Sequence, residues 1–394
     1  MRRIAANYIF PVNKPPLKNG IVEIDHNGAV LNLIDTKGDF TESRNLEFYN
    51  GVIVPGFVNS HCHLELSDLK GKLKQGLTHP GFIQEMVKFK KSHTIESTNK
   101  TAFLEDDLMK RNGIVAVGDI ANTELTIEVK HKSNIYYYTF IEVMGLSNNS
   151  EKIIINGLDL LKKYQSNKLS SSIVPHAPFS VSPELFERIK SLAIQTNSIQ
   201  SIHNQESDSE NQMFGSKQGK LVDAFLTLGI NLDNWKATGK NSLESVIDFL
   251  PNNNTILFVH NLYSSKNEIE KICKTFKNPF FVLCPNSNYF IESKYPDIEL
   301  FMNYSDKITL GTDSLASNTS LSILDEMKTI KNINSDISFE TLLSWATING
   351  AKALKCDNKY GSIEIGKQPG INLISDFDFT KMQITDKSSI KVFA

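Results

Sequence analysis

The chain has 394 residues, of which 40% are hydrophobic and 22% are charged, so it can fold around a core and is too apolar for bulk disorder. Its 42 basic and 44 acidic residues give a formal net charge of −2, which argues against nucleic-acid and acidic-membrane partners. No run is long enough to span a bilayer, no signal-peptide core follows Met1, and the four cysteines form no CxxC pair, so we expect a cytoplasmic protein.

The two ends of the chain both predict short strands. Ile21–Ile24 and Ala29–Ile34 flank a turn that contains Asn27-Gly28, a pair typical of tight hairpins. Short strands return around Gly361–Lys367 and Ile371–Ser375. We therefore expect residues 1–52 and 355–394 to form one small β-sandwich domain.

Residues 53–354 predict a repeated βα pattern. Apolar β-branched runs alternate with segments of helical periodicity, which indicates parallel strands. Eight such repeats favour a closed (β/α)8 TIM barrel over an open sheet. The expected strands are Val52–Asn59, Ile114–Asp119, Ile135–Val143, Ser172–His176, Ile199–His203, Ile256–His260, Phe280–Cys284 and Lys307–Gly311. The expected helices include Ile153–Tyr164, Pro183–Thr196 after a Ser182 cap, Ser265–Phe276, Leu321–Ile330 and Phe339–Leu354.

Titratable side chains gather where these strands end. They are His61, His63, His176, His203, His260 and Asp313. Each alone has a plain structural alternative, such as a hydrogen-bonded histidine at the barrel mouth or, for the aspartate, a helix cap. A barrel carries its active site at the carboxyl ends of its strands, so their joint placement on one rim indicates a metal centre.

The segment His61-Cys62-His63 is the most specific part of this group. In an extended chain residues i and i+2 project to the same side, so both imidazoles can reach one ion while Cys62 faces away. Taken alone, an HxH pair is more often structural than metal-binding. Its value depends on the other strand-end residues.

Motifs along nearly the whole chain resemble the metal-dependent amidohydrolase superfamily. The resemblance is to the branch of S-adenosylhomocysteine/methylthioadenosine deaminases, aminodeoxyfutalosine deaminases and chlorohydrolases. The matching segments are Val54–Glu65, Pro175-His176-Ala177-Pro178, His203-Asn204-Gln205-Glu206, Val259-His260-Asn261, Cys284–Asn288, Leu310–Ser314 and Gly361–Lys367.

The resemblance implies a role for several residues of these matching segments. It implies four ligands for one divalent metal ion, with zinc favoured and iron as the alternative: His61, His63, His203 and Asp313. Glu206 would shuttle a proton, His260 would position or polarise the metal-bound water, and His176 would contact the substrate. No lysine stands near His176, where binuclear relatives carry a carboxylated lysine, so we expect a single ion.

Other residues leave their roles open. Glu65 follows the histidine pair and could bind a substrate hydroxyl or, equally, hold a backbone amide. Lys70–Phe82 has the glycine content of a mobile flap, although a plain surface connection is the commoner explanation. The role of the acidic loop that begins at Glu206 and extends to Gly219 is also open. Four histidines outside the group are expected to be solvated, namely His26, His79, His93 and His131.

The function expected from the resemblance is hydrolytic deamination of an adenine-type heterocycle. The metal would activate a hydroxide, Asp313 would accept the proton of the water, and Glu206 would protonate the ring nitrogen before ammonia leaves. An amidohydrolase that opens a cyclic amide, a chlorohydrolase, and a catalytically silent binding barrel are the alternatives. The expected partner is a small-molecule substrate, and a homodimer is possible by analogy.

Overall fold

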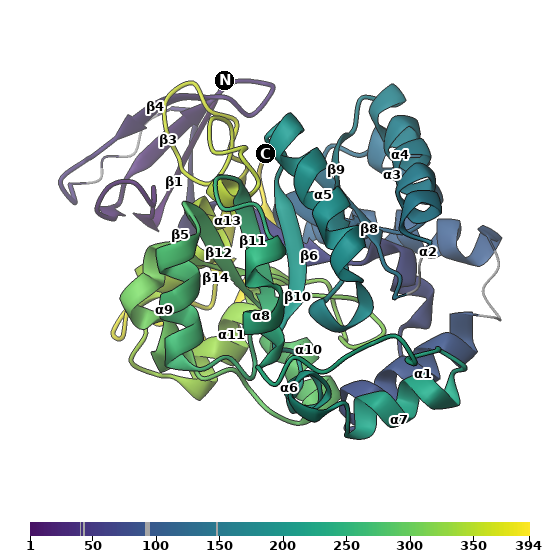
Figure 1. Cartoon of the computed structure of the whole chain (residues 1–394). Helices are drawn as coiled ribbons and strands as arrows, with labels where there is room; N and C mark the ends of the chain where they lie inside the picture. Colours follow the sequence, from purple (N-terminus) through teal and green to yellow (C-terminus); the bar gives the residue numbers. More distant parts are fainter. Residues whose placement is uncertain (40, 42–43, 91–94, 147–148) are drawn as a thin grey trace.

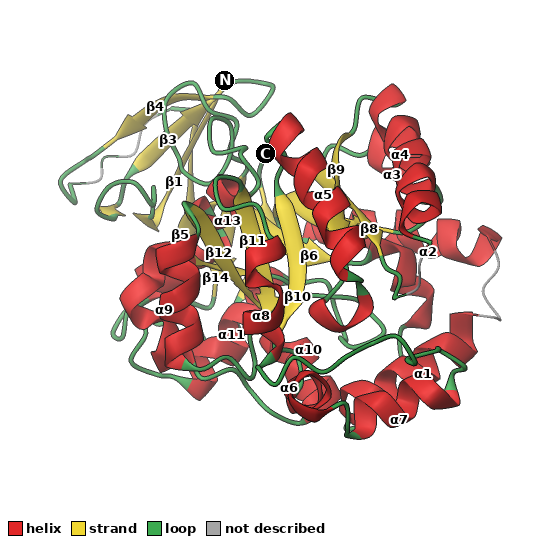
Figure 2. Ribbon diagram, in the orientation of Figure 1, coloured by secondary structure: helices red, strands yellow, loops and turns green. Residues whose placement is uncertain are grey.

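The strands of the computed structural model form three sheets, with helices packed around them (Figures 1 and 2). The structure describes residues 1–39, 41, 44–90, 95–146 and 149–394. Two of the sheets are parallel and have four strands each, and the third has seven strands. None of the helices in these described ranges is long and apolar enough to cross a membrane.

Eight parallel strands follow the order expected for a barrel, with different bounds for the first, and each pairs in parallel with the next one within its sheet. The first sheet consists of β6 (Phe57–Cys62), β7 (Ile114–Ala121), β8 (Tyr136–Val143) and β9 (Ser170–Pro175). The second consists of β10 (Gln200–Asn204), β11 (Thr255–His260), β12 (Asn278–Leu283) and β13 (Ile308–Leu310). The pairing therefore divides the expected barrel into two sheets instead of one continuous ladder.

Backbone hydrogen bonds join these two sheets at both seams. Between β9 and β10, the amide of His203 donates to the carbonyl of His176 over 3.0 Å. Between β13 and β6, the amides of Thr312 and Asp313 both donate to the carbonyl of His61, over 3.1 and 3.0 Å. Both seams lie at the carboxyl ends of strands, so the backbone bonds there fix the residues that carry the titratable side chains.

Helices follow the strands, and the start of one of them was predicted from its cap. Pro183–Thr196 is confirmed as α5, and the Ser182 hydroxyl accepts a bond from the Leu185 amide over 3.2 Å. The expected helix Phe339–Leu354 is wrong in one respect, because the backbone of Thr347 leaves helical angles and divides it in two. The α-helices are α1 (Thr78–Lys90), α2 (Ile95–Arg111), α3 (Ile127–Lys132), α4 (Ser150–Ser166), α5 (Pro183–Thr196), α6 (Asp208–Ser216), α7 (Lys220–Thr227), α8 (Ser242–Val246), α9 (Lys266–Thr275), α10 (Pro285–Glu292), α11 (Ile323–Ile333), α12 (Phe339–Ala346) and α13 (Ile348–Ala353). Short 3-10 helices span Leu64–Leu69, Pro178–Ser180, Ile247–Phe249 and Ile298–Lys307.

The third sheet combines strands from both ends of the chain (Figure 1). Its strands are β1 (Arg2–Ile9), β2 (Leu17–Lys18), β3 (Ile21–Ile24), β4 (Val30–Ile34), β5 (Leu46–Pro55), β14 (Ile371–Ser375) and β15 (Ser389–Val392). The expected hairpin is present as β3 and β4, and β14 pairs with β5. Among the described residues this is a single seven-stranded sheet where a β-sandwich was expected, and Gly361–Lys367 forms no strand.

The expected first barrel strand, Val52–Asn59, was wrong because it joins two strands that belong to different sheets. The chain leaves β5 at Pro55 and enters β6 at Phe57, and Gly56 stands between them. A Cβ atom on Gly56 would lie 2.3 Å from Val115 and 2.7 Å from the carbonyl of Pro369, so only glycine fits this crossing. The apolar run continues through the crossing, which is why the pattern alone did not reveal it.

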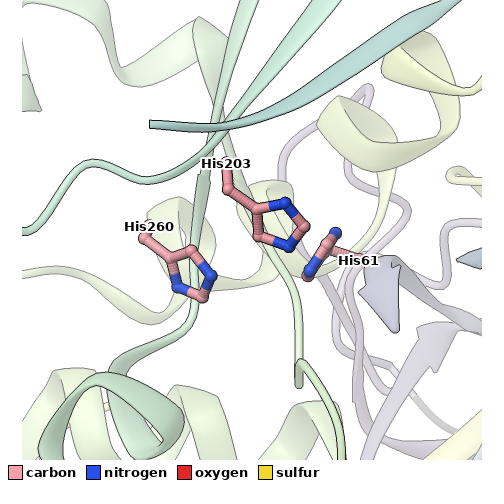
Figure 3. A group of neighbouring side chains, drawn as sticks. All are labelled: His61, His203 and His260. Atoms are coloured by element: carbon pink, nitrogen blue, oxygen red, sulfur yellow. The ribbon is translucent and has the colours of Figure 1, made fainter. Parts of the chain in front are cut away.

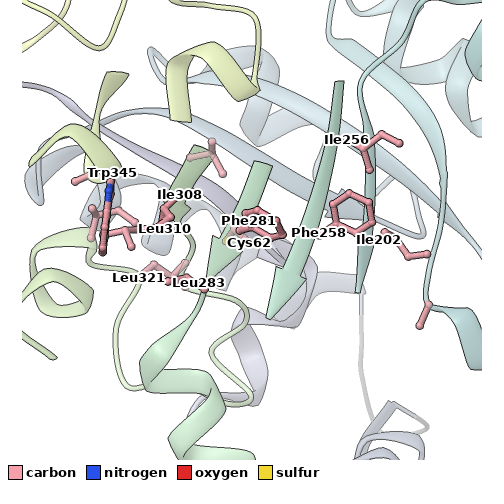
Figure 4. Packing of buried hydrophobic residues seen from close by; sticks show 14 of the residues in the cluster. Cys62, Ile202, Ile256, Phe258, Phe281, Leu283, Ile308, Leu310, Leu321 and Trp345 are labelled. Atoms are coloured by element: carbon pink, nitrogen blue, oxygen red, sulfur yellow. The ribbon is translucent and has the colours of Figure 1, made fainter. Parts of the chain in front are cut away.

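Buried apolar side chains hold the parallel strands and their helices together. Figure 4 shows part of this core, in which Phe258 and Phe281 lie among the strands and Trp345 of α12 lies near Ile308 and Leu310. All three are fully buried, and each contributes on the order of 2 kcal/mol of burial free energy. Cys62 belongs to the same cluster, so its side chain faces the core and not the histidines on either side of it.

Candidate metal centre

The strand-end residues converge on one place. His61 lies in β6, His203 in β10 and His260 at the end of β11, and Figure 3 shows their three imidazoles turned toward one another. Nitrogen atoms of these three residues lie within 4.8 Å of each other, and so do ligand atoms of His61, His63 and Asp313. The two groups share His61, so five strand-end side chains form one cluster.

The distances within this cluster match those between ligands of one small ion. Nε2 of His63 lies 3.1 Å from Nε2 of His61 and 3.3 Å from Nε2 of His203. Oδ1 of Asp313 lies 3.4 Å from Nε2 of His63 and 3.6 Å from Nε2 of His61. Ligands about 2.0–2.1 Å from a tetrahedral zinc ion lie about 3.3–3.4 Å from one another. The four predicted ligands therefore fit a single divalent ion.

The charges of these groups also fit a cation. Burial lowers the pKa of His61. Burial and the nearby imidazoles of His61 and His203 also bring the pKa of His63 well below its usual value. Burial alone would raise the pKa of Asp313, but its contacts with His61 and His63 hold that pKa well below the usual value. Neutral imidazoles and one ionised carboxylate are the donor set that zinc-like sites use.

Neighbouring groups orient these side chains. Oδ2 of Asp313 accepts hydrogen bonds from the hydroxyls of Ser287 and Ser317, over 2.6 and 2.8 Å. Nδ1 of His203 lies 2.8 Å from the carbonyl of His176, so this nitrogen carries the ring proton and Nε2 is left with its lone pair. Such outer contacts fix the tautomer and orientation of metal-binding histidines and carboxylates.

The backbone turns sharply where the cluster begins. His260 has φ 72°, Asn261 has φ 55°, Asp313 has φ 57° and Gln205 has φ 51°, although none of them is glycine. Left-handed backbone at ordinary residues is unfavourable and persists where the surrounding structure enforces it, often at functional sites. These turns direct the side chains of His260 and Asp313 back into the cluster.

Glu206 follows β10 and lies beside the histidines, as predicted from the motif. Its Oε1 is 3.7 Å from Nε2 of His260, and its side chain is almost fully buried. Burial, reinforced by the charges of Asp313 and three other carboxylates, raises the pKa of Glu206 well above its usual value. A buried carboxyl group whose pKa is raised in this way suits a general acid.

His79 was predicted to be solvated, and that prediction was wrong. The side chain is 4% exposed, and its Nε2 lies 3.2 Å from Oε2 of Glu206. The residue lies in the first turn of α1, and α1 packs against α7. The contact with Glu206 places this turn next to the segment that follows β10. Of the other three histidines in that prediction, His26 and His131 are exposed, and His93 lies outside the described residues.

A cavity of about 400 Å³ opens onto the cluster. Its polar end is lined by His63, His176, His203, Glu206, His260 and Asp313. The rest of the lining is mostly apolar and includes Phe82, Met86, Met144, Phe225 and Leu228. The segment expected to be a flap thus contributes His79 and Phe82 to the wall of the cavity.

Two further carboxylates, Glu65 and Glu142, lie near the metal-ligand cluster. Glu65 is buried and accepts bonds from the amides of Asn122 and Thr123, over 3.1 and 3.0 Å, and it is not among the residues that line the cavity. This geometry matches the backbone-holding alternative. Glu142 does line the cavity, although it was not among the residues predicted from the sequence. It is the last residue but one of the expected strand Ile135–Val143, so the strand-end rule could have found it.

Three comparisons relate the chain to known proteins. The sequence profile of the amidohydrolase family matches residues 52–391. Among curated proteins, an adenosine deaminase of Helicobacter pylori is 28% identical over 379 residues, covering 92% of this chain and 87% of that protein. A 5'-deoxyadenosine deaminase of Methanococcus vannielii is 26% identical and covers 85% and 77%, respectively.

Solved structures share the fold. The aminofutalosine deaminase of Helicobacter pylori, solved with methylthio-coformycin, has a TM-score of 0.82 at 24% identity and covers 100% of this chain and 98% of that one. An adenosine deaminase from Xanthomonas campestris with bound zinc has a TM-score of 0.77 at 21% identity, with 98% and 86% covered.

Proposed function

The chain belongs to the amidohydrolase family, and from this premise we propose that it is a hydrolytic deaminase of an adenine-type heterocycle in a small nucleoside-like molecule. Family membership makes it a hydrolase of carbon–nitrogen bonds other than peptide bonds. The curated relatives that it matches are named as deaminases of adenosine-type compounds. The observation that carries the proposal is the buried carboxyl of Glu206 beside an imidazole–carboxylate cluster in one cavity.

The ligand set is His61, His63, His203 and Asp313, and we propose one divalent ion there, with zinc first and iron as the alternative. When bound, such an ion lowers the pKa of a coordinated water and so supplies a nucleophile at neutral pH. The zinc bound in the Xanthomonas campestris adenosine deaminase, which shares the fold, supports zinc as the first choice. The two serine hydroxyls that hold Oδ2 of Asp313 also keep its Oδ1 directed at the cluster.

Proton transfers in the proposed reaction belong to three side chains. Glu206 gives its proton to the ring nitrogen next to the carbon that bears the amino group, which removes charge as that carbon becomes tetrahedral. Asp313 takes one proton from the attacking water and passes it to the departing amine, so that ammonia leaves. The ionised Glu206 then takes the remaining proton of the added hydroxyl, which leaves a carbonyl on the ring and restores the acid. Nδ2 of Asn288 lies 3.2 Å from Nδ1 of His260 and can only donate, so His260 presents a protonated Nε2 to the site.

The charges of the side chains that line the cavity restrict which substrates it can bind. None of its described lining residues is lysine or arginine, whereas Glu142, Glu206 and Asp313 are acidic. An anionic substituent would therefore be buried without a cationic partner, at a cost of several kcal/mol. The apolar end instead suits an uncharged, apolar group. We propose a 5'-substituted adenosine whose substituent carries no charge, such as a methylthio or deoxy group.

An ammonia-release assay across matched substrates tests this proposal. We expect kcat/KM for 5'-methylthioadenosine and 5'-deoxyadenosine to exceed that for S-adenosylhomocysteine, whose tail carries a carboxylate and an ammonium group, by at least about tenfold, because a desolvation cost of about 1.4 kcal/mol already gives that factor. The zinc-loaded full chain is compared with the same protein after removal of the ion. A preference for the carboxylate-bearing substrate would contradict the proposed cavity specificity. Ammonia from none of these compounds, together with turnover of a chlorinated heterocycle or a cyclic amide, would contradict the deaminase itself.

A further inference from the structure

His79 contacts the proposed acid without belonging to the predicted metal ligands. Its Nε2 lies 3.2 Å from Oε2 of Glu206, and its Nδ1 lies 3.3 Å from the hydroxyl of Ser207. Its ring also packs edge-on against Phe179, with 5.5 Å between ring centroids. The imidazole is therefore held on three sides.

The backbone at His79 is fixed as firmly as its ring. Thr78, which precedes it, has φ 58°, an unfavourable left-handed angle for a β-branched residue. The amide of His79 donates to Oε1 of Glu292 over 2.6 Å, and Oε2 of Glu292 accepts from the hydroxyl of Tyr263 over 3.1 Å. The strained backbone at Thr78 and the bond from the His79 amide to Glu292 together hold the His79 ring against Glu206. The contact is therefore built into the fold.

We propose that His79 is a positioning residue whose Nε2–H donates to Oε2 of Glu206, so that the acid proton of Glu206 stays on Oε1. The proposal rests on the proposed function, because it assigns the orientation of the acid in that reaction. Oε1 is the oxygen that faces His260 and the histidine cluster. No bond forms or breaks at His79, and it acts only through Glu206.

The hydrogen-bonding partners of His79 favour this tautomer. A hydroxyl such as that of Ser207 can donate to Nδ1, and a carboxyl oxygen can accept from Nε2–H. The opposite tautomer would need Glu206 to donate its own proton to Nε2, which would turn that proton away from the cluster. Burial and the neighbouring His176 and His203 lower the pKa of His79 to about 3, so the ring stays neutral and offers one N–H.

Substitutions at His79 separate positioning from packing. In the zinc-loaded full chain, we expect His79→Leu to lower kcat by about 10- to 100-fold while KM changes by less than about threefold, since a misplaced acid loses rate more than binding. His79→Gln keeps an N–H donor near the position of Nε2 and should restore most of the lost kcat. His131→Leu, which removes an exposed histidine of α3, is the matched control and should leave kcat unchanged. Equal losses in His79→Leu and His79→Gln, or no loss in either, would overturn the proposal.

The tautomer itself gives a readout that does not depend on turnover. Long-range proton–nitrogen NMR spectra of the histidine-labelled wild-type protein should show His79 protonated at Nε2, with the signal assigned by its loss in His79→Gln. Protonation at Nδ1 would overturn the proposal even if both variants were slow. If the wild-type protein released no ammonia from any adenine-type nucleoside, the proposed function would fail, and this spectrum would still decide the contact.

Discussion

Glu206→Gln should lower kcat by about 10²- to 10⁴-fold and leave the metal content of the purified protein unchanged. The amide has nearly the shape of the acid and can still accept a bond from His79, but it holds no acidic proton for the ring nitrogen. Because Glu206 is not one of the four predicted ligands, the ion should bind as in the wild type. The measurement pairs steady-state ammonia release with elemental analysis of the same sample.

A neighbouring carboxylate provides the control for that change. Asp208 lies two residues away in the first turn of α6 and is exposed, so Asp208→Asn removes a negative charge without reaching the cavity. Its kcat should stay within about twofold of the wild type, as for most surface substitutions away from a site. Near-wild-type turnover by Glu206→Gln would remove this residue from the mechanism, and a parallel loss of metal would make it a ligand instead.

Asp313→Asn should remove both the bound ion and the activity. The cluster contains neutral imidazoles and one ionised carboxylate, so this substitution deletes its only negative charge while keeping the shape of the side chain. We expect the purified variant to retain little metal after dialysis and to lose at least about 10³-fold in kcat/KM, because no neighbouring group can replace a lost ligand. Elemental analysis and ammonia release again measure the two effects separately.

A milder substitution beside Asp313 should cause a smaller loss of metal affinity. Ser287→Ala removes one of the two hydroxyls that donate to Oδ2 of Asp313, while Ser317 keeps the other. Loss of such an outer contact typically weakens metal binding by about 10- to 100-fold. We therefore expect an intermediate metal affinity, measured by competition with a chelator. Full metal occupancy in Asp313→Asn would show that the ion is bound at a site that does not include Asp313.

The strand-end rule accounts for how much of this site could be predicted. His203 and His260 end their expected strands, and parallel strands bring their carboxyl ends to one edge, so proximity followed from topology. The pairing of the two chain ends was also predictable, because alternating strands such as β3 and β14 need partners. Strand patterns and the polar residues at strand ends can be recognised from short stretches of sequence.

His79 shows what such local patterns do not contain. It lies in a glycine-rich segment outside any expected strand, and nothing in its neighbouring residues indicates burial. Its position depends on the packing of α1 against α7 and on the bond to Glu292, which is more than two hundred residues away in the sequence. The crossing at Gly56 was missed for a similar reason, since the contact with Pro369 that requires glycine comes from the other end of the chain.

The source of the oxygen atom that replaces the amino group tests metal-dependent hydrolytic deamination directly. Zinc-loaded protein is incubated with 5'-methylthioadenosine in water enriched in heavy oxygen, and the product is weighed by mass spectrometry. We predict a purine product that has lost its amino group as ammonia and carries one solvent oxygen in its place, with no product when the ion is removed. Unchanged substrate, or turnover that persists without any metal, would contradict this mechanism.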